Sequence, residues 1–196
     1  MVEALIRAFV AVPCGEPLTR ELSLRLDAAA LGADGPPPVR WTHPRTWHLT
    51  LQFLGDWPRG RLRTLQEALA GVAGPAPVDL APDGLGGFPD LRRPRVLFLQ
   101  FAGAGPLVEL AAEVHRVSAR VWPDGPQDTR PVHPHLTLTR IRDPLEPWQV
   151  KSMQNIDLHG LPPVRLDGFR LYASTLGPQG ARHAELAAYA LRKKGE

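Results

Sequence analysis

The chain has 196 residues, of which 43% are hydrophobic and 22% charged, and it carries a formal net charge of +3. This composition excludes a disordered chain, the single cysteine excludes an intrachain disulfide, and no apolar run approaches the roughly 18 residues of a membrane-spanning helix. Most of the 23 basic residues are arginine, which suits bidentate contacts with phosphate, although charge balance alone is weak evidence for a nucleic-acid ligand.

In the first half of the chain, runs of apolar residues predict two strands, and apolar residues at helical spacing predict two helices. These elements are a strand at Leu5–Val12, a helix at Glu16–Leu31, a strand at His48–Leu54 and a helix with Leu62, Leu65, Leu69 and Val72 on one face. A turn rich in glycine and proline is expected at 32–38. Asp56 and Pro58 have the character of a helix start, so the second helix is expected to begin there.

The second half of the chain is expected to contain more strand than helix. The predicted strands are Val78–Leu85, Arg95–Phe101, His135–Ile141, Val164–Tyr172 and His183–Tyr189. Pro106 opens a predicted amphipathic helix whose buried face carries Leu107, Leu110, Val114, Val117 and Val121. A weaker helix is predicted at Trp148–Ile156. This order of elements favours an α+β fold over a doubly wound parallel sheet.

An internal repeat divides the chain into two comparable halves. The tetrapeptide His-Leu-Thr-Leu occurs at His48–Leu51 and again at His135–Leu138, each time after a His-Pro pair. A shuffled chain of this composition should contain roughly 0.007 copies. The repeat therefore predicts one bilobal domain over residues 1–196, with two pseudo-symmetric lobes. Each lobe is expected to be an antiparallel sheet with helices on its outer face, and the active-site cleft is expected between the lobes.

The repeated tetrapeptide brings an imidazole and a hydroxyl to one face of each strand. Side chains alternate along a strand, so His48 and Thr50 share one face, and His135 and Thr137 do the same in the second copy. Imidazole gives or takes a proton near neutral pH, and a threonine hydroxyl can donate a hydrogen bond to a phosphate oxygen. Two such pairs across a cleft predict acid–base chemistry on a phosphodiester, with no need for a metal.

The twin motifs resemble those of the 2H phosphoesterase superfamily. The similarity is greatest to the bacterial and archaeal RNA 2′,3′-cyclic phosphodiesterases, historically called 2′-5′ RNA ligases. Five segments carry the resemblance: Arg7–Pro13, Trp47–Gly55, Gly84–Arg95, His133–Arg140 and Asp167–Gly177. The resemblance implies hydrolysis of 2′,3′-cyclic phosphate ends to 2′-phosphates, without a cofactor, and implies the reverse joining of RNA ends through a 2′-5′ linkage.

The resemblance also implies a role for each motif residue. His48 would donate a proton to the leaving 3′-oxygen, and His135 would be the base that activates water. Thr50 and Thr137 would hold the phosphate.

The resemblance also concerns three residues outside the repeated tetrapeptides. Arg140 would contact phosphate, although strict alternation places it on the leucine face unless a bulge re-aims it. Phe9, in the opening strand, would stack on the nucleobase. His183 stands where the family often has tyrosine, so the role of that tyrosine is open here.

The expected partners and location follow from the same features. The partners are RNA with a 2′,3′-cyclic phosphate terminus or cyclic nucleotides, and no membrane is expected. The N-terminus has no basic segment typical of a secretion signal, and one cysteine fits a reducing compartment, so we expect a cytoplasmic monomer.

Three alternatives remain open at this stage. One is a zinc hydrolase with His48, His133 and His135 as ligands, which chelation would inactivate. Another is a non-catalytic module that binds RNA ends and shows no turnover. The third has the same chemistry on another cyclic nucleotide or on a 2′-5′ linked oligonucleotide.

Overall fold

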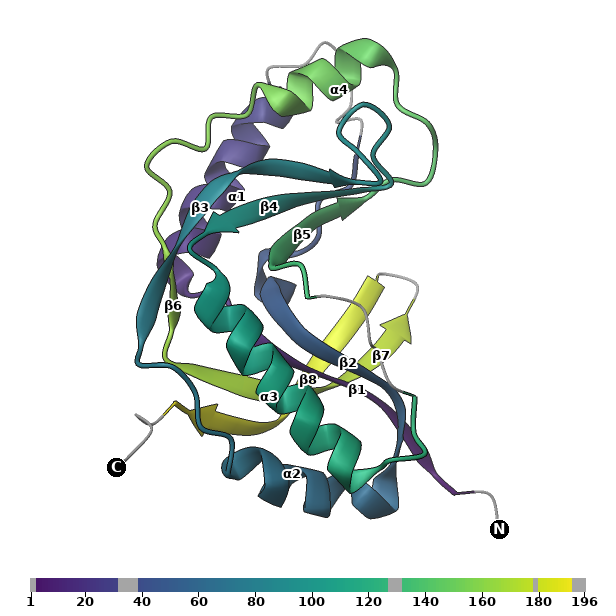
Figure 1. Cartoon of the computed structure of the whole chain (residues 1–196). Helices are drawn as coiled ribbons and strands as arrows, with labels where there is room; N and C mark the ends of the chain where they lie inside the picture. The colour runs from purple at the N-terminus through teal and green to yellow at the C-terminus, as the bar shows by residue number, and fades with distance from the viewer. Residues whose placement is uncertain (1–2, 32–38, 127–131, 178–179, 192–196) are drawn as a thin grey trace.

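The computed structural model describes residues 3–31, 39–126, 132–177 and 180–191, and the strands in these ranges form two antiparallel sheets (Figure 1). The first sheet has the strand order β2 (His48–Pro58), β1 (Leu5–Pro13), β7 (Gly168–Gly177) and β8 (Gly180–Ala190). The second has the order β5 (His135–Arg140), β4 (Val96–Ala102), β3 (Val78–Phe88) and β6 (Val164–Leu166). The predicted α+β class with two sheets is confirmed. The turn expected at 32–38 lies outside the described residues.

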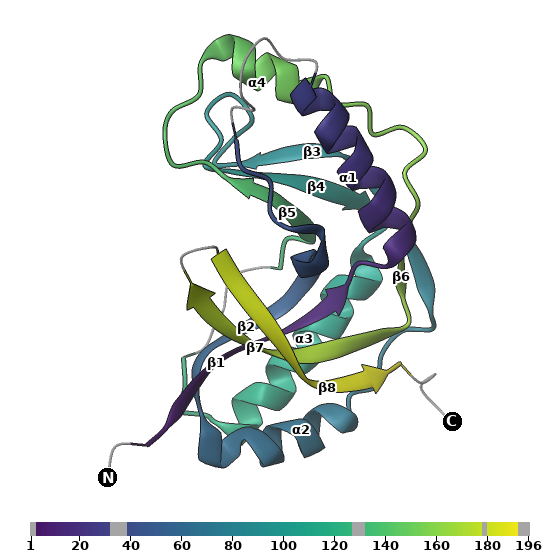
Figure 2. The same ribbon diagram turned by 180° about the vertical axis from the view of Figure 1, so that it is seen from behind.

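Two helices accompany each sheet. Helices α2 (Leu62–Ala70) and α3 (Gly105–Val121) pack together, and α3 lies against β2 of the first sheet (Figure 1). Helices α1 (Glu16–Leu31) and α4 (Pro147–Gln154) accompany the second sheet (Figure 2). None of the helices in the described ranges combines the length and apolarity that a membrane crossing requires.

The two halves of the chain exchange elements between the lobes. Helix α1 connects β1 to β2 but lies on the second sheet, whereas α3 connects β4 to β5 but lies on the first (Figures 1 and 2). Strand β3 comes from the first half and pairs with β4, and β7 comes from the second half and pairs with β1. The first lobe is therefore completed by α3, β7 and β8 from the second half, and the second lobe by α1 and β3 from the first half.

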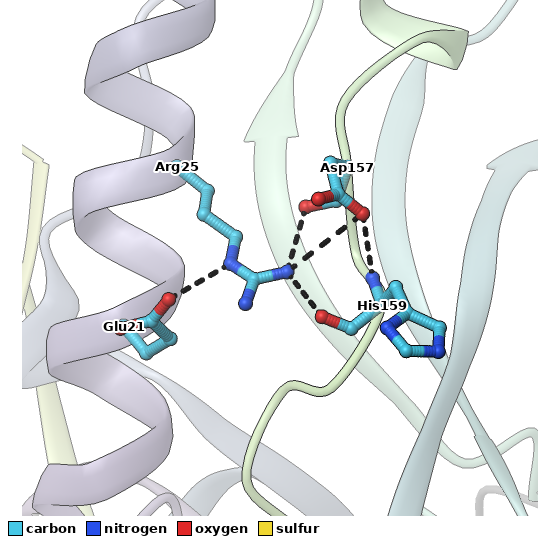
Figure 3. A network of polar contacts seen from close by, with 4 residues as sticks. All are labelled: Glu21, Arg25, Asp157 and His159. Atoms are coloured by element: carbon cyan, nitrogen blue, oxygen red, sulfur yellow. Dashed lines mark hydrogen bonds and ion pairs between the residues drawn. The ribbon is translucent and has the colours of Figure 1, made fainter.

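Helix α1 is tied to the second lobe by a polar network (Figure 3). The Arg25 guanidinium donates hydrogen bonds to the backbone carbonyls of Asp157 (3.1 Å) and His159 (2.6 Å), in the segment that leads into β6. Glu21, one turn earlier on α1, accepts a hydrogen bond from Arg25 Nε at 3.0 Å. These contacts hold the helix against a loop that is more than 130 residues away in the sequence.

The start of the second helix differs from the sequence prediction. The strand β2 runs on through Asp56 and Trp57 to Pro58, because these residues pair with the first residues of β1. Trp57 is 3% exposed, so its burial favours the extended conformation that brings it into the core. The helix begins only at Leu62, after a 3₁₀ turn at Arg59–Arg61, and the prediction from Asp56 and Pro58 is wrong.

The strand predicted at Val164–Tyr172 is two strands in different sheets. The chain leaves β6 at Leu166, passes through Asp167 and enters β7 at Gly168. A Cβ at Gly168 would lie 2.6 Å from the Tyr189 carbonyl oxygen, so only glycine allows this close approach of backbones. Asp167 and Gly168 interrupt the apolar pattern between Leu166 and Phe169, but the sequence does not show that the two sides of this break join different sheets.

Candidate active site

The two His-Leu-Thr-Leu strands face each other at the centre of the molecule. Strands β2 and β5 are edge strands of their sheets, and their backbones approach one another. The four leucines of the motifs are 0–3% exposed, as alternation predicts. The other four motif side chains line a single cleft: His48, Thr50, His135 and Thr137.

The two imidazoles are oriented by the same hydrogen bond. His48 Nδ1 lies 2.6 Å from the carbonyl oxygen of Thr46, and His135 Nδ1 lies 2.6 Å from that of His133. A carbonyl oxygen only accepts, so Nδ1 carries the proton in both rings. Nε2 of each ring is therefore the nitrogen that exchanges a proton. Sequence reasoning did not foresee that residue i−2 supplies this acceptor.

Each imidazole rests on a buried phenylalanine from the neighbouring strand. The ring of Phe9 in β1 lies 4.9 Å from that of His48, and the ring of Phe98 in β4 lies 5.1 Å from that of His135. Phe9 is 3% exposed because His48, Tyr172 and His183 cover it. Phe9 also lines the cleft, but its burial disfavours the expected stacking of a base on its ring, which stays a prediction.

A matching β-bulge lies at the last residue of each motif. Leu51 is an extra residue between Thr50 and Gln52, opposite two consecutive residues of β1, and Leu138 is the extra residue in β5. A bulge shifts the alternation by one, so Phe53 and Arg140 both line the cleft.

Phe53 is the aromatic residue that the sequence analysis missed. Its side chain is 48% exposed, and its ring centroid lies 6.1 Å from that of Phe9. The available signal was the repeat itself, since extending both copies by two residues aligns Phe53 with Arg140.

A third imidazole lies beside the first motif. His183 in β8 lines the cleft, with its ring centroid 5.5 Å from that of His48 and 4.8 Å from that of Phe9. In the second lobe His133 holds a comparable place, 6.3 Å from His135, but it is exposed. The position where the family often has tyrosine therefore brings a titratable ring against His48.

The environment of both motif histidines favours the neutral imidazole. Burial lowers the pKa of His48 from 6.5 to about 4, and the neighbouring imidazoles of His183 and His135 add to the lowering. Burial also lowers the pKa of His135, with smaller contributions from the charges of His133 and Arg140. An anion in the cleft would act in the opposite direction, because a negative charge stabilises imidazolium.

One threonine outside the motifs links the two lobes at the site. The Trp47 indole N–H donates to Thr42 Oγ1 at 2.8 Å, and Thr42 Oγ1 donates to the carbonyls of Thr137 and Leu138, both at 2.9 Å. Trp47 immediately precedes His48, so this chain of hydrogen bonds joins one motif strand to the other.

The three histidines that the zinc-hydrolase alternative requires as metal ligands do not come together. Within the part of the chain that the structure describes, no three His, Cys, Asp or Glu side chains are placed to hold a metal ion. His48, His133 and His135 thus do not surround a common point.

Comparison with known sequences points to one family. The family model described as "LigT like Phosphoesterase" matches residues 18–98 and 102–183. The RNA 2′,3′-cyclic phosphodiesterase of Geobacillus stearothermophilus is 33% identical over 150 residues, which cover 76% of this chain and 46% of that protein. The enzyme of the same name from Aquifex aeolicus is 37% identical over 53% of this chain and 55% of its own. The chain thus spans about half the length of these two relatives. A third, from Methanothermobacter thermautotrophicus, is 26% identical over 95% of this chain and 99% of its own.

Solved structures share the fold over nearly the whole chain. The protein TT0787 of Thermus thermophilus superposes with a TM-score of 0.70 at 26% identity, covering 96% of this chain and 100% of that one. Apo LigT of E. coli superposes with a TM-score of 0.71 at 23% identity, covering 98% of this chain and 100% of that one. At this identity the likeness shows a shared fold and no more.

Proposed function

Since the chain belongs to the LigT-like phosphoesterase family, we propose that it hydrolyses 2′,3′-cyclic phosphate ends of RNA to 2′-phosphates. One observation carries the proposal: two imidazoles with the same Nδ1 hydrogen bond lie on facing strands of one cleft. In the proposed complex, one imidazole accepts a proton and the other donates one, on opposite sides of the phosphorus atom.

The proposed reaction is an in-line displacement. His135 Nε2 takes a proton from water, whose oxygen forms a bond to phosphorus. The bond from phosphorus to the 3′-oxygen breaks, and His48 Nε2 gives its proton to that oxygen. Thr50 and Thr137 donate hydrogen bonds to the non-bridging oxygens, where negative charge grows in the transition state. A 5′-hydroxyl in place of water would give the 2′-5′ linkage by the same steps.

Arg140 and Phe53 complete the proposed substrate site. Arg140 lies close enough to influence the pKa of His135, and its positive charge would stabilise the phosphate at that end of the cleft. Phe53 has an exposed ring on the first lobe, and we assign the stacking of the terminal base to it in place of Phe9.

Domain organisation and location complete the proposal. We propose a single domain over residues 1–196, supported by the exchange of helices and strands between the lobes. We also propose a cytoplasmic location, because a single cysteine fits a reducing compartment, and the monomeric state stays a prediction.

The function is tested with purified protein in EDTA, supplied with 2′,3′-cyclic mononucleotides and with an RNA oligomer that ends in a cyclic phosphate. We expect phosphorus NMR to show conversion to a 2′-phosphomonoester. Binding of the oligomer without turnover would identify the non-catalytic module, and loss of activity on chelation would identify the zinc hydrolase. A 3′-phosphate product would contradict the breaking of the bond to the 3′-oxygen.

The dependence of kcat/KM on pH is a second test. The reaction needs one motif histidine neutral and the other protonated, and this state is most populated between their two pKa values. Both pKa values are lowered below 6.5 in the free protein, so kcat/KM should be greatest below pH 6.5 and fall as pH rises. Bound phosphate raises both pKa values, so kcat should fall only at higher pH. Initial rates from about pH 4 to about pH 9 measure both profiles, and a kcat/KM that still rises above about pH 8 would contradict the assignment.

A further inference from the structure

The residues just before the first motif form an additional extended segment along the free edge of β5. Trp41 makes an isolated antiparallel bridge with Thr139, and the Thr42 N–H donates to the Leu138 carbonyl at 2.7 Å. The Thr139 hydroxyl donates to the Arg40 carbonyl at 2.8 Å. These bonds fix the backbone of the segment against the strand that carries His135.

The register of this pairing places two arginines opposite each other. With Trp41 opposite Thr139 in an antiparallel bridge, Arg40 lies opposite Arg140. Both side chains are exposed and both line the cleft. Like charges directly opposite on neighbouring strands destabilise the pairing unless a counter-charge lies between them.

Among the residues that the structure describes, no carboxylate supplies that counter-charge. Asp27 and Asp143 also line the cleft, but across the described ranges of the chain neither forms an ion pair with Arg40 or Arg140. Arg142, two residues beyond Arg140, lines the cleft as well. This wall is therefore positive and suited to an anion from outside the protein.

The cleft is larger than one cyclic nucleotide requires. Its volume is about 1670 Å³, above the roughly 300–1,000 Å³ typical of sites for small molecules. It extends from the motifs past Arg40 to Ser23 and Leu26 on α1. A nucleotide bound at the two histidines therefore leaves space in the cleft for a second nucleotide on the side towards Arg40 and α1.

We propose that Arg40 and Arg140 form a second phosphate subsite, which binds the phosphodiester one nucleotide upstream of the cyclic end. The inference rests on the proposed function and narrows its substrate class to RNA of two or more nucleotides. Arg140 has five N–H donors and serves both phosphates, whereas Arg40 serves only the upstream one. The bidentate geometry of arginine suits the two non-bridging oxygens of a phosphodiester.

The first test compares a cyclic-phosphate dinucleotide, ApA, with the cyclic mononucleotide of adenosine. Arg40→Ala is expected to lower kcat/KM about tenfold or more for the dinucleotide and less than about twofold for the mononucleotide. Arg45→Ala is the matched control, because Arg45 is exposed in the same segment but does not line the cleft, and it should change neither value.

The second test changes the substrate and leaves the protein intact. In the ApA dinucleotide, the phosphodiester between the two adenosines is replaced by a neutral methylphosphonate. With the wild-type protein, its kcat/KM should be lower than that of the normal dinucleotide by about the factor that Arg40→Ala causes. The Arg40→Ala substitution should not lower kcat/KM further on this substrate. Equal loss on mononucleotide and dinucleotide would place Arg40 at the scissile phosphate and overturn the subsite. No loss on either substrate would also overturn it.

Binding separates the subsite from the proposed function. The 2′-phosphate products of both substrates are titrated calorimetrically into wild-type protein and Arg40→Ala, a measurement that needs no turnover. A weakening confined to the dinucleotide product supports the subsite even if hydrolysis fails. Equal affinities of the two proteins for the dinucleotide product would overturn it.

Discussion

Replacing either His48 or His135 by alanine is expected to lower kcat by about 10²–10⁴-fold, because each substitution removes one of the two proton transfers. The double variant should be little worse than the poorer single variant, since residues that act as a unit do not contribute additively. Initial rates on a 2′,3′-cyclic nucleotide measure all three variants.

The matched control for these substitutions is His159→Ala. His159 is exposed in the segment before β6, and its contact with Arg25 uses the backbone carbonyl, which alanine keeps. The control should retain wild-type activity, and circular dichroism should show that all variants keep the fold. A loss of less than about tenfold in either single variant would remove that histidine from the mechanism.

Replacing Thr50 or Thr137 by valine is expected to lower kcat by about 10²-fold, the usual cost of deleting one donor to developing negative charge. Valine keeps the shape and the strand preference of threonine, so the loss should fall on the reaction and not on stability.

Serine provides the control for the threonine substitutions. Thr50→Ser and Thr137→Ser keep the hydroxyl and should restore most of the activity that valine removes. Valine variants with activity within about threefold of wild type would show that the hydroxyls do not stabilise the transition state.

The elements of the fold that periodicity determines could be predicted from the sequence. The helix Glu16–Leu31 was predicted with its observed bounds, because its leucines recur on one face and glycines and prolines follow it. The change of sheet at Asp167 could not be predicted, since it depends on the long-range pairing of β6 with β3 and of β7 with β1. The extension of β2 through Trp57 depends on pairing with residues 5–7, which are distant in the sequence.

Some residues of the site could likewise be predicted from the sequence, and others could not. The motif repeat placed both histidines and both threonines on one cleft, as alternation predicts. The positions of Phe53 and Arg140 depend on bulges, and a bulge is set by the register with β1 or β4, which the sequence does not display. The burial of Phe9 likewise depends on β7 and β8, which bring Tyr172 and His183 over it.

The exchange of α1 with α3 and of β3 with β7 has the form of a domain-swapped dimer whose two subunits are joined in one polypeptide. A half-length ancestor could have built the whole groove by self-association, since a twofold axis would set two identical His-x-Thr strands face to face. Fusion then freed the two copies to diverge. The aromatic side chain after one motif and the guanidinium after the other are two such differences, and with the proposed roles of Phe53 and Arg140 they would give the groove a base end and a phosphate end.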